Sequence, residues 1–415
     1  MTIKRVLGLG TYPIVKPVHG GQRRVHAFKQ FYRTLGIEYV YACVYSGAHY
    51  SRPFVSDLDV PFVKPLDLDG LPHFDLPFLD DMFSGSQVER HDATLRHFLR
   101  IVDRVDPDAL QVEQAFAWPL ARKLMEAHPD RFRLIYSSHN IEAPLKGAIL
   151  ERNGVSAPVA MEVMSAVEAI EQECCTAASL VVCVSDVDCR YYRNWKAPEY
   201  IVVVPNGAER PPAEAPDLSQ VRDVFGEEPF LMSVGSSYPP NIEGLCDLIF
   251  RDGAFFLPPV KSLAICGGMA DGAFQHHEYQ RYREANSARV HFFPAIEESR
   301  LWAIKAGCRG TMLPLQTGGG TNLKTAEALA LGKWVVATSV ALRGFQRFAQ
   351  DEGVIIADDR RSFRRAIAHV LQARPLEIST STRQQRDSLY WDRCFVDSGL
   401  STKIHQVSES GTGKS

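Results

Sequence analysis

The amino-acid sequence lacks three features that would assign the protein to a common class. No apolar run reaches the roughly 20 residues that a membrane-spanning helix needs. The 415 residues carry a net charge of only −3, which gives no basic field for nucleic acid. The nine cysteines are scattered and none forms a Cys-x-x-Cys pair, so neither a zinc cluster nor a thioredoxin-type site is supported. We interpret them as buried, reduced thiols of a cytoplasmic protein.

The sequence does contain a regular alternation of short apolar, β-branched runs with helical stretches. Near-continuous hydrophobic strands spaced by helices are typical of parallel sheets that are covered on both faces. The runs that we predict as strands are 5–10, 39–45, 109–112, 133–136, 180–184, 201–204, 230–234, 262–266, 290–293, 311–314, 334–337 and 353–356.

A turn signal divides this alternation into two halves. Pro205-Asn206-Gly207 is followed by the proline-rich segment 210–216 before the strands resume. We therefore predict an α/β protein of two doubly wound, Rossmann-like parallel-sheet domains that face an interdomain cleft. The predicted limits are 1–207 for the N-terminal domain, 208–385 for the C-terminal domain, 386–407 for a C-terminal helix that packs back toward the N-terminal domain, and 408–415 for a disordered tail.

The segment 313–333 carries the strongest functional signal. A glycine triplet separates an apolar strand from a helix of strong helix formers, and the free N–H groups of such a helix start favour an anion. Lys324 and Glu327 are three residues apart and share one helix face. A cation beside a carboxylate suits a ligand with phosphates at one end and hydroxyls at the other, such as a nucleotide sugar. The alternative is a packing turn with a solvated Lys/Glu pair. The other candidate binding residues here are Gly318, Gly319, Gly320, Thr321 and Asn322.

Three further turns between a predicted strand and a helix supply candidate residues. Ligands of parallel sheets bind beyond the carboxyl ends of the strands, where these turns lie. His139 could hydrogen-bond a sugar hydroxyl or a phosphate oxygen, with Asn140 or Glu142 orienting it. Ordinary helix-entry turns and loop residues are the alternative interpretation. The candidates are Gly20 and Gly21 at the first helix, His139 and Asn140 after strand 133–136, and Gly235, Ser236 and Asn241 after strand 230–234.

Three motif-like segments fail the requirements of the sites they imitate. Residues 411–415, Gly-Thr-Gly-Lys-Ser, lack the strand and helix that frame a phosphate loop. Pro13 stands where the Gly8-x-Gly10 turn would need its third glycine, so we expect no NAD site. Aspartates at loops and helix starts serve as caps and turns, so we predict no essential metal. These aspartate pairs are Asp57/Asp59, Asp67/Asp69, Asp106/Asp108 and Asp186/Asp188.

Taken in order along the chain, the candidate segments resemble the retaining family 4 glycosyltransferases of GT-B architecture, in particular the bacterial exopolysaccharide-type group. The resemblance implies a nucleotide-diphosphate sugar held mainly by the C-terminal domain and an acceptor held mainly by the N-terminal domain. It implies that Glu327 binds the ribose hydroxyls and that His139 contacts the donor sugar near the leaving phosphate. The amides of residues 319–321 would then meet the diphosphate or the sugar. The matching segments are 20–21, 139–142, 203–207, 235–241, 318–333, 335–338 and Trp391.

Two departures from the family pattern concern charge. Gly319 occupies the position, eight residues before the ribose-binding glutamate, where the family often has an acidic residue. Many members also carry an arginine and a lysine after the strand that here ends at Gly235, where this chain has Tyr238-Pro239-Pro240-Asn241. Lys324, inferred from its spacing to Glu327, is therefore the clearest cation for the leaving group.

We expect transfer of a hexose-type unit to a saccharide or lipid-linked acceptor with retention, in bacterial polysaccharide or glycoconjugate synthesis. The nucleotide sugar is the substrate, and we expect no cofactor, no metal and no nucleic acid partner. A basic N-terminal face formed by Arg23, Arg24, Lys29 and Arg33 leaves peripheral contact with the inner face of the cytoplasmic membrane open. The alternatives are a catalytically inactive GT-B module that binds nucleotide as an assembly partner, a sugar-nucleotide epimerase, and an NAD-dependent oxidoreductase, which Pro13 disfavours.

Overall fold

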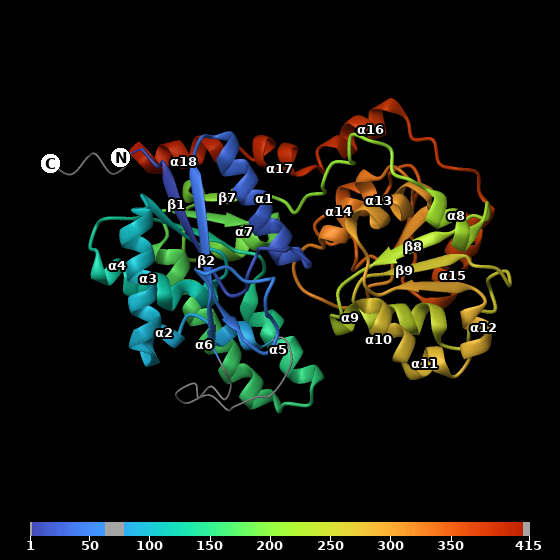
Figure 1. Ribbon diagram of the computed structural model, residues 1–415, viewed down its shortest axis with the longest axis horizontal. Helices are drawn as coiled ribbons and strands as arrows, with labels where there is room; N and C mark the ends of the chain where they lie inside the picture. Colours follow the sequence, from blue (N-terminus) through green and yellow to red (C-terminus); the bar gives the residue numbers. More distant parts are fainter. Residues whose placement is uncertain (1, 63–78, 410–415) are drawn as a thin grey trace. The chain divides into compact units, whose positions relative to one another are not determined.

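A computed structural model describes residues 2–62 and 79–409 (Figure 1). The chain forms two compact units, one made of Met1–Pro205 with Phe395–Ser415 and the other of Asn206–Cys394. Asp67, Asp69 and residues 411–415 lie outside the described residues, as does the predicted tail apart from Ser408 and Glu409, which end the last helix.

The first unit is built on a seven-stranded sheet with the order β3-β2-β1-β4-β5-β6-β7, in which every pair is parallel. The strands are β1 (Arg5–Gly10), β2 (Glu38–Ser46), β3 (Val60–Phe62), β4 (Ala109–Val112), β5 (Arg133–Ser137), β6 (Leu180–Cys183) and β7 (Ile201–Val203). The helices are α1 (Gly20–Thr34), α2 (Gln87–Arg90), α3 (Asp92–Val105), α4 (Trp118–Ala127), α5 (Glu142–Arg152), α6 (Ala157–Ala177), α7 (Asp186–Tyr192) and α18 (Leu400–Glu409).

The second unit repeats this plan with a six-stranded parallel sheet of order β10-β9-β8-β11-β12-β13. The strands are β8 (Leu231–Val234), β9 (Leu263–Cys266), β10 (Val290–Phe293), β11 (Gly310–Leu313), β12 (Trp334–Ala337) and β13 (Val354–Ile356). The helices are α8 (Ser219–Phe225), α9 (Pro239–Leu245), α10 (Met269–Gln275), α11 (His277–Gln280), α12 (Arg283–Ser287), α13 (Glu298–Gly307), α14 (Leu323–Ala330), α15 (Arg360–Gln372) and α16 (Thr380–Asp387). Helix α17 (Trp391–Asp397) contains the point at which the chain passes back to the first unit.

The predicted fold class is confirmed, because both sheets are parallel and have helices interleaved between their strands. Each of the twelve predicted runs overlaps a strand of the structure. Strand β3 was not predicted: it is a three-residue edge strand with Pro61 at its centre, and proline cannot donate a hydrogen bond to a sheet.

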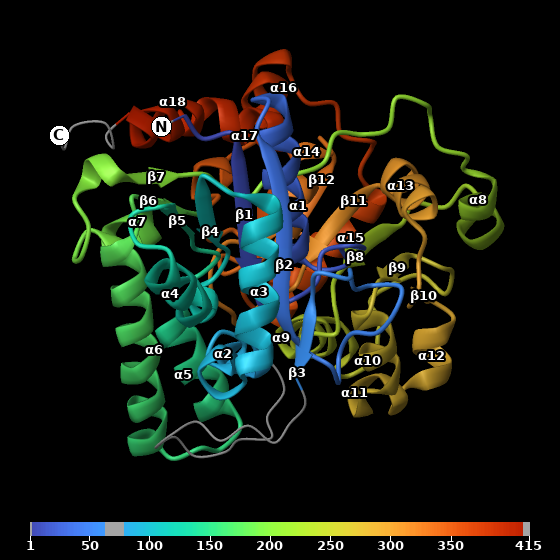
Figure 2. The ribbon, with the colours of Figure 1, turned by 60° about the vertical axis from the view of Figure 1, so that its left-hand side comes forward.

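Helices cover both faces of each sheet, which explains why the central strands are apolar throughout. In the second unit, α13 and α14 lie on one side of the strands, and α9 and α10 lie on the other (Figure 1). In the first unit, α5 and α6 lie side by side in both ribbon views (Figure 1, Figure 2). Gly147 permits this contact, since a Cβ at this position would lie 2.2 Å from Met164 Sδ.

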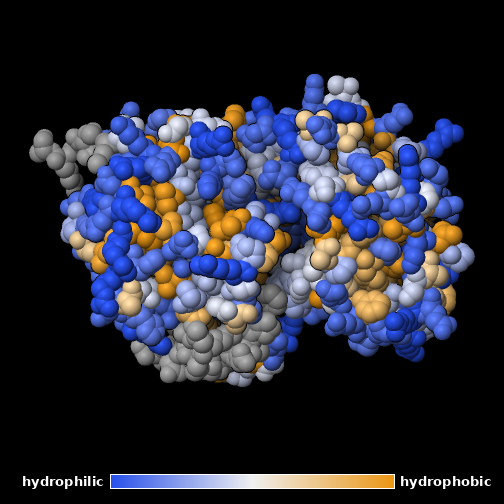
Figure 3. Space-filling model, in the orientation of Figure 1, coloured by the Kyte–Doolittle hydropathy of each residue, from blue (hydrophilic) through white to orange (hydrophobic). Residues whose placement is uncertain are grey.

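On the face shown in Figure 3, hydrophilic residues cover most of each unit, with small groups of hydrophobic residues between them. Among the residues that the structure describes, we find no helix long and apolar enough to span a bilayer. Arg24 does not contribute to the predicted basic face. It is 1% exposed, donates a hydrogen bond to Val204 O at 3.0 Å and lies over the Phe28 ring.

The strand orders place one switch point in each sheet. In the first sheet, β2 and β3 extend the sheet on one side of β1, and β4 then pairs with β1 on its other side. In the second sheet, β9 and β10 lie on one side of β8, and β11 pairs with β8 on its other side. Ligands of open parallel sheets bind outside the carboxyl ends of such neighbouring strands. In the second unit the two segments at this place are the turn after β8 and the glycine triplet after β11.

Candidate functional site

The glycine triplet adopts backbone conformations that other residues rarely take. Gly318 has φ 137° and Gly320 has φ 58°. The loop is held in place by neighbouring side chains, because Arg343 Nε donates to Gly320 O at 2.7 Å and Asn206 Nδ2 donates to both oxygens of Thr321, at 3.2 Å and 2.9 Å. These hydrogen bonds hold the backbone of the loop in place at the start of the following helix.

Helix α14 follows this loop and begins at Leu323. Its residues are mainly strong helix formers, and it ends before Gly332, whose φ of 67° is typical of a helix C-terminus. Thr325 Oγ1 donates to Ala341 O at 2.7 Å and so fixes the first turn against the segment after β12. The N-terminus of α14, which is the positive end of the helix dipole, is thereby presented at the carboxyl end of β11.

Lys324 links the two segments that meet at the switch point. Its Nζ donates to Asn241 Oδ1 at 2.5 Å, and Asn241 Nδ2 donates to Ser236 O at 3.0 Å. Burial lowers the pKa of the Lys324 ammonium to about 7, because desolvation disfavours the charged form. The structure therefore brings together the predicted residues Lys324, Asn241 and Ser236, with Gly235 directly before the last.

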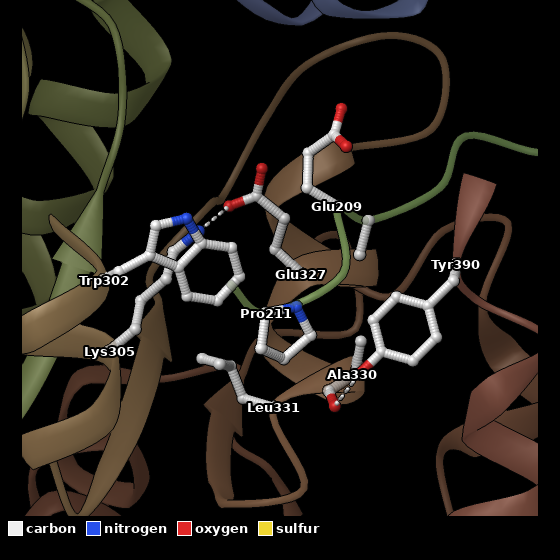
Figure 4. Close-up of a pocket in the computed structure, with 9 residues that line it drawn as sticks. Glu209, Pro211, Trp302, Lys305, Glu327, Ala330, Leu331 and Tyr390 are labelled. Carbon is white, nitrogen blue, oxygen red and sulfur yellow. Dashed lines mark hydrogen bonds and ion pairs between the residues drawn. The ribbon is translucent and has the colours of Figure 1, made fainter. Parts of the chain in front are cut away.

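Glu327 lies near Lys324 but has a different cation as its partner. Lys305 Nζ lies 2.9 Å from Glu327 Oε2, and the two side chains are 5% and 14% exposed (Figure 4). Lys305 also lies over the Trp302 ring, with Nζ 4.5 Å from the ring centroid. Lys305, Lys324 and Glu327 line one small pocket between α13, α14 and the ends of β8 and β11. Sequence reasoning missed Lys305.

The first unit holds a second group of predicted residues around His139, which is buried after β5. His139 Nδ1 lies 2.9 Å from Tyr12 Oη, and Nε2 lies 3.2 Å from Glu113 Oε2. Burial lowers the pKa of this imidazole, against the opposing effect of Glu113. Because the carboxylate can only accept, the neutral ring donates from Nε2 and accepts at Nδ1 from Tyr12. Both ring nitrogens therefore have protein partners in this conformation.

Gly21, at the start of α1, packs against the same tyrosine. A Cβ at Gly21 would lie 2.2 Å from Tyr12 Oη. Gly20 is the first residue of α1, and the His19 ring contacts the Tyr12 ring edge to face with centroids 4.8 Å apart. Tyr12 thus connects the predicted glycine pair with His139, and no motif in the sequence had pointed to Tyr12.

Asn140 belongs to an adjacent cluster of charged groups. Its Nδ2 donates to Glu142 Oε1 at 3.3 Å. Burial raises the pKa of Glu142 to about 7; Lys146 opposes this shift and Asp81 adds to it. Lys146 Nζ lies 2.6 Å from Asp81 Oδ1 and 4.0 Å from Glu142 Oε2. The candidate residues thus form two groups, one in each unit.

Both halves of the chain match glycosyltransferase family models. Residues 18–210 match the model described as "Glycosyltransferase Family 4", and residues 228–373 match "Glycosyl transferases group 1". The chain carries glycosyltransferase domains. A comparison with curated proteins gives no match.

Solved structures support the GT-B fold of this glycosyltransferase. Sucrose-phosphate synthase from Thermosynechococcus elongatus has a TM-score of 0.67 at 16% identity, over 98% of this chain and 100% of that chain. HepE from Anabaena, in complex with UDP and glucose, has a TM-score of 0.57 at 14% identity, over 99% and 100%. The UDP-forming α,α-trehalose-phosphate synthase from Burkholderia vietnamiensis has a TM-score of 0.56 at 13% identity, over 99% and 100%. Identities this low establish the fold alone.

Within the described ranges of this glycosyltransferase, no group of three or more His, Cys, Asp or Glu side chains is arranged to hold a metal ion. The predicted Asp106/Asp108 pair has structural partners instead. Asp106 bridges Arg5 at 2.6 Å and Arg131 at 2.8 Å, and Asp108 accepts from the Arg5 backbone N–H at 2.9 Å. Metal independence of the reaction remains a prediction.

Proposed function

We propose that this glycosyltransferase moves a sugar from a nucleotide-diphosphate donor to a saccharide or lipid-linked acceptor, with retention at the anomeric carbon and without a metal or a cofactor. The donor binds the second unit, and the first unit holds the acceptor. The observation that carries the proposal is that Lys324 and Glu327, on the helix that follows the glycine triplet, line one pocket between β8 and β11, the strands of the switch point. We place the reaction in bacterial polysaccharide or glycoconjugate synthesis, in the cytoplasm.

The chemistry of the two side chains supports this assignment. Lys324 lies in the first turn of α14, so its ammonium and the helix N-terminus offer positive charge at the same end of the loop. Glu327 lies one turn further along and is suited to accept hydrogen bonds from the two ribose hydroxyls. HepE has been solved with UDP and glucose and with UDP-glucose, which supports a nucleotide sugar as the class of donor.

Transfer requires stabilisation of the charge that develops on the departing diphosphate as the anomeric carbon becomes cationic. Lys324 and the amides of residues 319–321 supply fixed charge and hydrogen-bond donors for this purpose. We infer retention by attack of the acceptor on the face from which the diphosphate leaves. Under this mechanism the acceptor proton passes to the leaving phosphate oxygen, so no enzyme nucleophile is required.

The test has two stages. Nucleotide sugars with different bases are first screened for thermal stabilisation, since a ligand that binds the folded state raises the melting temperature. The best donor is then incubated with saccharide and lipid-linked acceptors, and the anomeric configuration of the product is determined by NMR. Retention of the donor configuration supports the proposal, and inversion contradicts the mechanism.

Two other outcomes would replace the proposal. Tight donor binding without transfer to any acceptor would identify a nucleotide-binding partner that lacks activity, which the glycine at position 319 would explain. Deuterium incorporation at C2 of the donor in heavy water would identify an epimerase.

A further inference from the structure

The ion pair between Lys305 and Glu327 is unusual because Lys305 belongs to an otherwise apolar part of α13. Its neighbours Leu301, Ala303 and Ile304 are buried against the sheet, and Lys305 itself is 4% exposed. A buried ammonium is costly unless a carboxylate and further contacts compensate it. Here Glu327 and the Trp302 ring provide that compensation.

The packing of α13 holds the backbone of Lys305 in place beside Glu327. Leu301 and Ile304 belong to the hydrophobic cluster that also contains Phe293 at the end of β10, so the backbone of this helix is held by the core of the second unit. Glu327 stands on a different helix, α14, 22 residues along the chain. The orientation of its carboxylate is therefore set by a group outside its own helix.

We propose that Lys305 is a positioning residue that orients the Glu327 carboxylate toward the two hydroxyls of a ribonucleotide. This inference rests on the proposed function and adds a specificity-determining residue to the donor site. A carboxylate accepts hydrogen bonds from two neighbouring hydroxyls best when the plane of the carboxylate is held in one orientation. A charge-assisted hydrogen bond from Lys305 to one carboxylate oxygen of Glu327 provides that constraint. Lys305 itself does not contact the ligand; it acts through Glu327.

Discrimination between ribonucleotides and 2′,3′-dideoxynucleotides tests this role directly. UDP, ADP and GDP are compared with their 2′,3′-dideoxy analogues by calorimetry, and the tightest-binding base is used. We expect the wild-type protein to bind the ribonucleotide at least about ten-fold more tightly, the scale of a hydrogen bond to a charged group. Glu327→Ala should reduce this ratio to about two-fold or less. Lys305→Met should reduce it to a similar value, and Lys305→Arg, which keeps the charge, should restore much of it.

A matched control separates positioning from a general loss of stability. Lys333 also binds α13, because its Nζ donates to the carbonyl oxygens of Ala306 and Cys308 at the end of this helix. Lys333→Met should lower the melting temperature and leave the ribose ratio unchanged. If Lys305→Met does not fold, Lys305→Gln replaces it. Its side chain is shorter and uncharged, so the hydrogen bond to Glu327 is weakened, and the ratio should fall, but by less than in Glu327→Ala.

The outcomes distinguish this inference from the proposed function. If Glu327→Ala loses the discrimination while Lys305→Met keeps the wild-type ratio, the positioning role is overturned and the ribose site stands. If Glu327→Ala keeps the wild-type ratio, the ribose assignment fails together with the inference. If the wild-type protein binds none of the three ribonucleotides and is stabilised by no nucleotide sugar, the proposed donor site itself is overturned.

Discussion

At the scale of single residues, Lys324 is the group on which the proposed chemistry depends most. We expect Lys324→Ala to lower kcat by two or more orders of magnitude, the scale for removing one group that stabilises developing charge. The measurement is the steady-state rate of sugar transfer, with Lys333→Ala as a control for the loss of a lysine elsewhere in the second unit. A Lys324→Ala variant with near-wild-type kcat would show that Lys324 does not stabilise the developing charge.

The low pKa of Lys324 predicts a pH dependence for ligand binding. Burial lowers this pKa to about 7, so in the free protein the ammonium is progressively lost above pH 7. A diphosphate favours the charged form, so binding should take up a proton, and affinity should fall by up to about ten-fold per pH unit between pH 7 and 9. Calorimetry in buffers of different ionisation enthalpy measures this uptake. Lys324→Gln should show neither effect; a pH-independent wild type would contradict the assignment.

The lowered pKa of Lys324 also makes the free energy of unfolding depend on pH. The unfolded chain holds the Lys324 proton up to about pH 10.4, whereas the folded protein loses it near pH 7. The unfolded state therefore binds more protons in this window, and the contribution of Lys324 to the free energy of unfolding rises with pH across it. The destabilising effect of the buried charge is fully present below pH 7.

The residues of the donor site differ in how far sequence could predict them. Lys324 and Glu327 share a helix, so their spacing was informative. Their partners Asn241 and Lys305 lie 83 and 22 residues away, on other elements, and no local spacing connects a residue to a partner at that distance. The position of this lysine in the apolar second half of α13, after Leu301-Trp302-Ala303-Ile304, was the available signal for Lys305.

At the scale of elements, the approach of α9 to the end of β11 positions the site. Gly244 allows this approach, since a Cβ there would lie 1.9 Å from Pro314 O, a backbone atom. We expect Gly244→Ala to destabilise the protein by about 1–3 kcal/mol through overpacking. It should also weaken nucleotide binding, because α9 carries Asn241, the partner of Lys324.

Urea unfolding followed by nucleotide titration checks this prediction. Gly307→Ala is a suitable control, because the nearest atom to its Cβ would be Val221 Cγ1 at 3.1 Å, a side-chain atom that can move. Equal losses of stability and affinity in both variants would argue against a specific role for the contact between α9 and the end of β11.

The elements themselves were largely predictable, because buried parallel strands have a distinctive composition. The twelve predicted runs are all strands, and the switch points follow from the order in which they pair. The polar network around His139 was not predictable, because Tyr12 and Glu113 follow two other strands and meet His139 only once β1, β4 and β5 are aligned in the sheet.

At the scale of the whole molecule, the site residues fall into two groups in separately compact units. A nucleoside diphosphate at about 100 times its Kd should stabilise the bound state by about 2.7 kcal/mol. We expect the resulting slowing of hydrogen exchange, up to about 100-fold, to be strongest at residues 235–241 and 318–324. Exchange mass spectrometry with and without the ligand measures it. Protection confined to the first unit would place the nucleotide elsewhere.

The first unit is assembled from both ends of the described chain. Phe395 of α17 stacks on Phe31 of α1 with ring centroids 4.5 Å apart and contacts Phe28 at 5.0 Å. During synthesis on the ribosome, α1 is translated more than 350 residues before Phe395. The whole second unit is therefore translated before α17 can cover the rings of Phe28 and Phe31. The nascent protein thus carries an exposed aromatic surface through most of translation, and this surface is where a chaperone that binds hydrophobic segments would act.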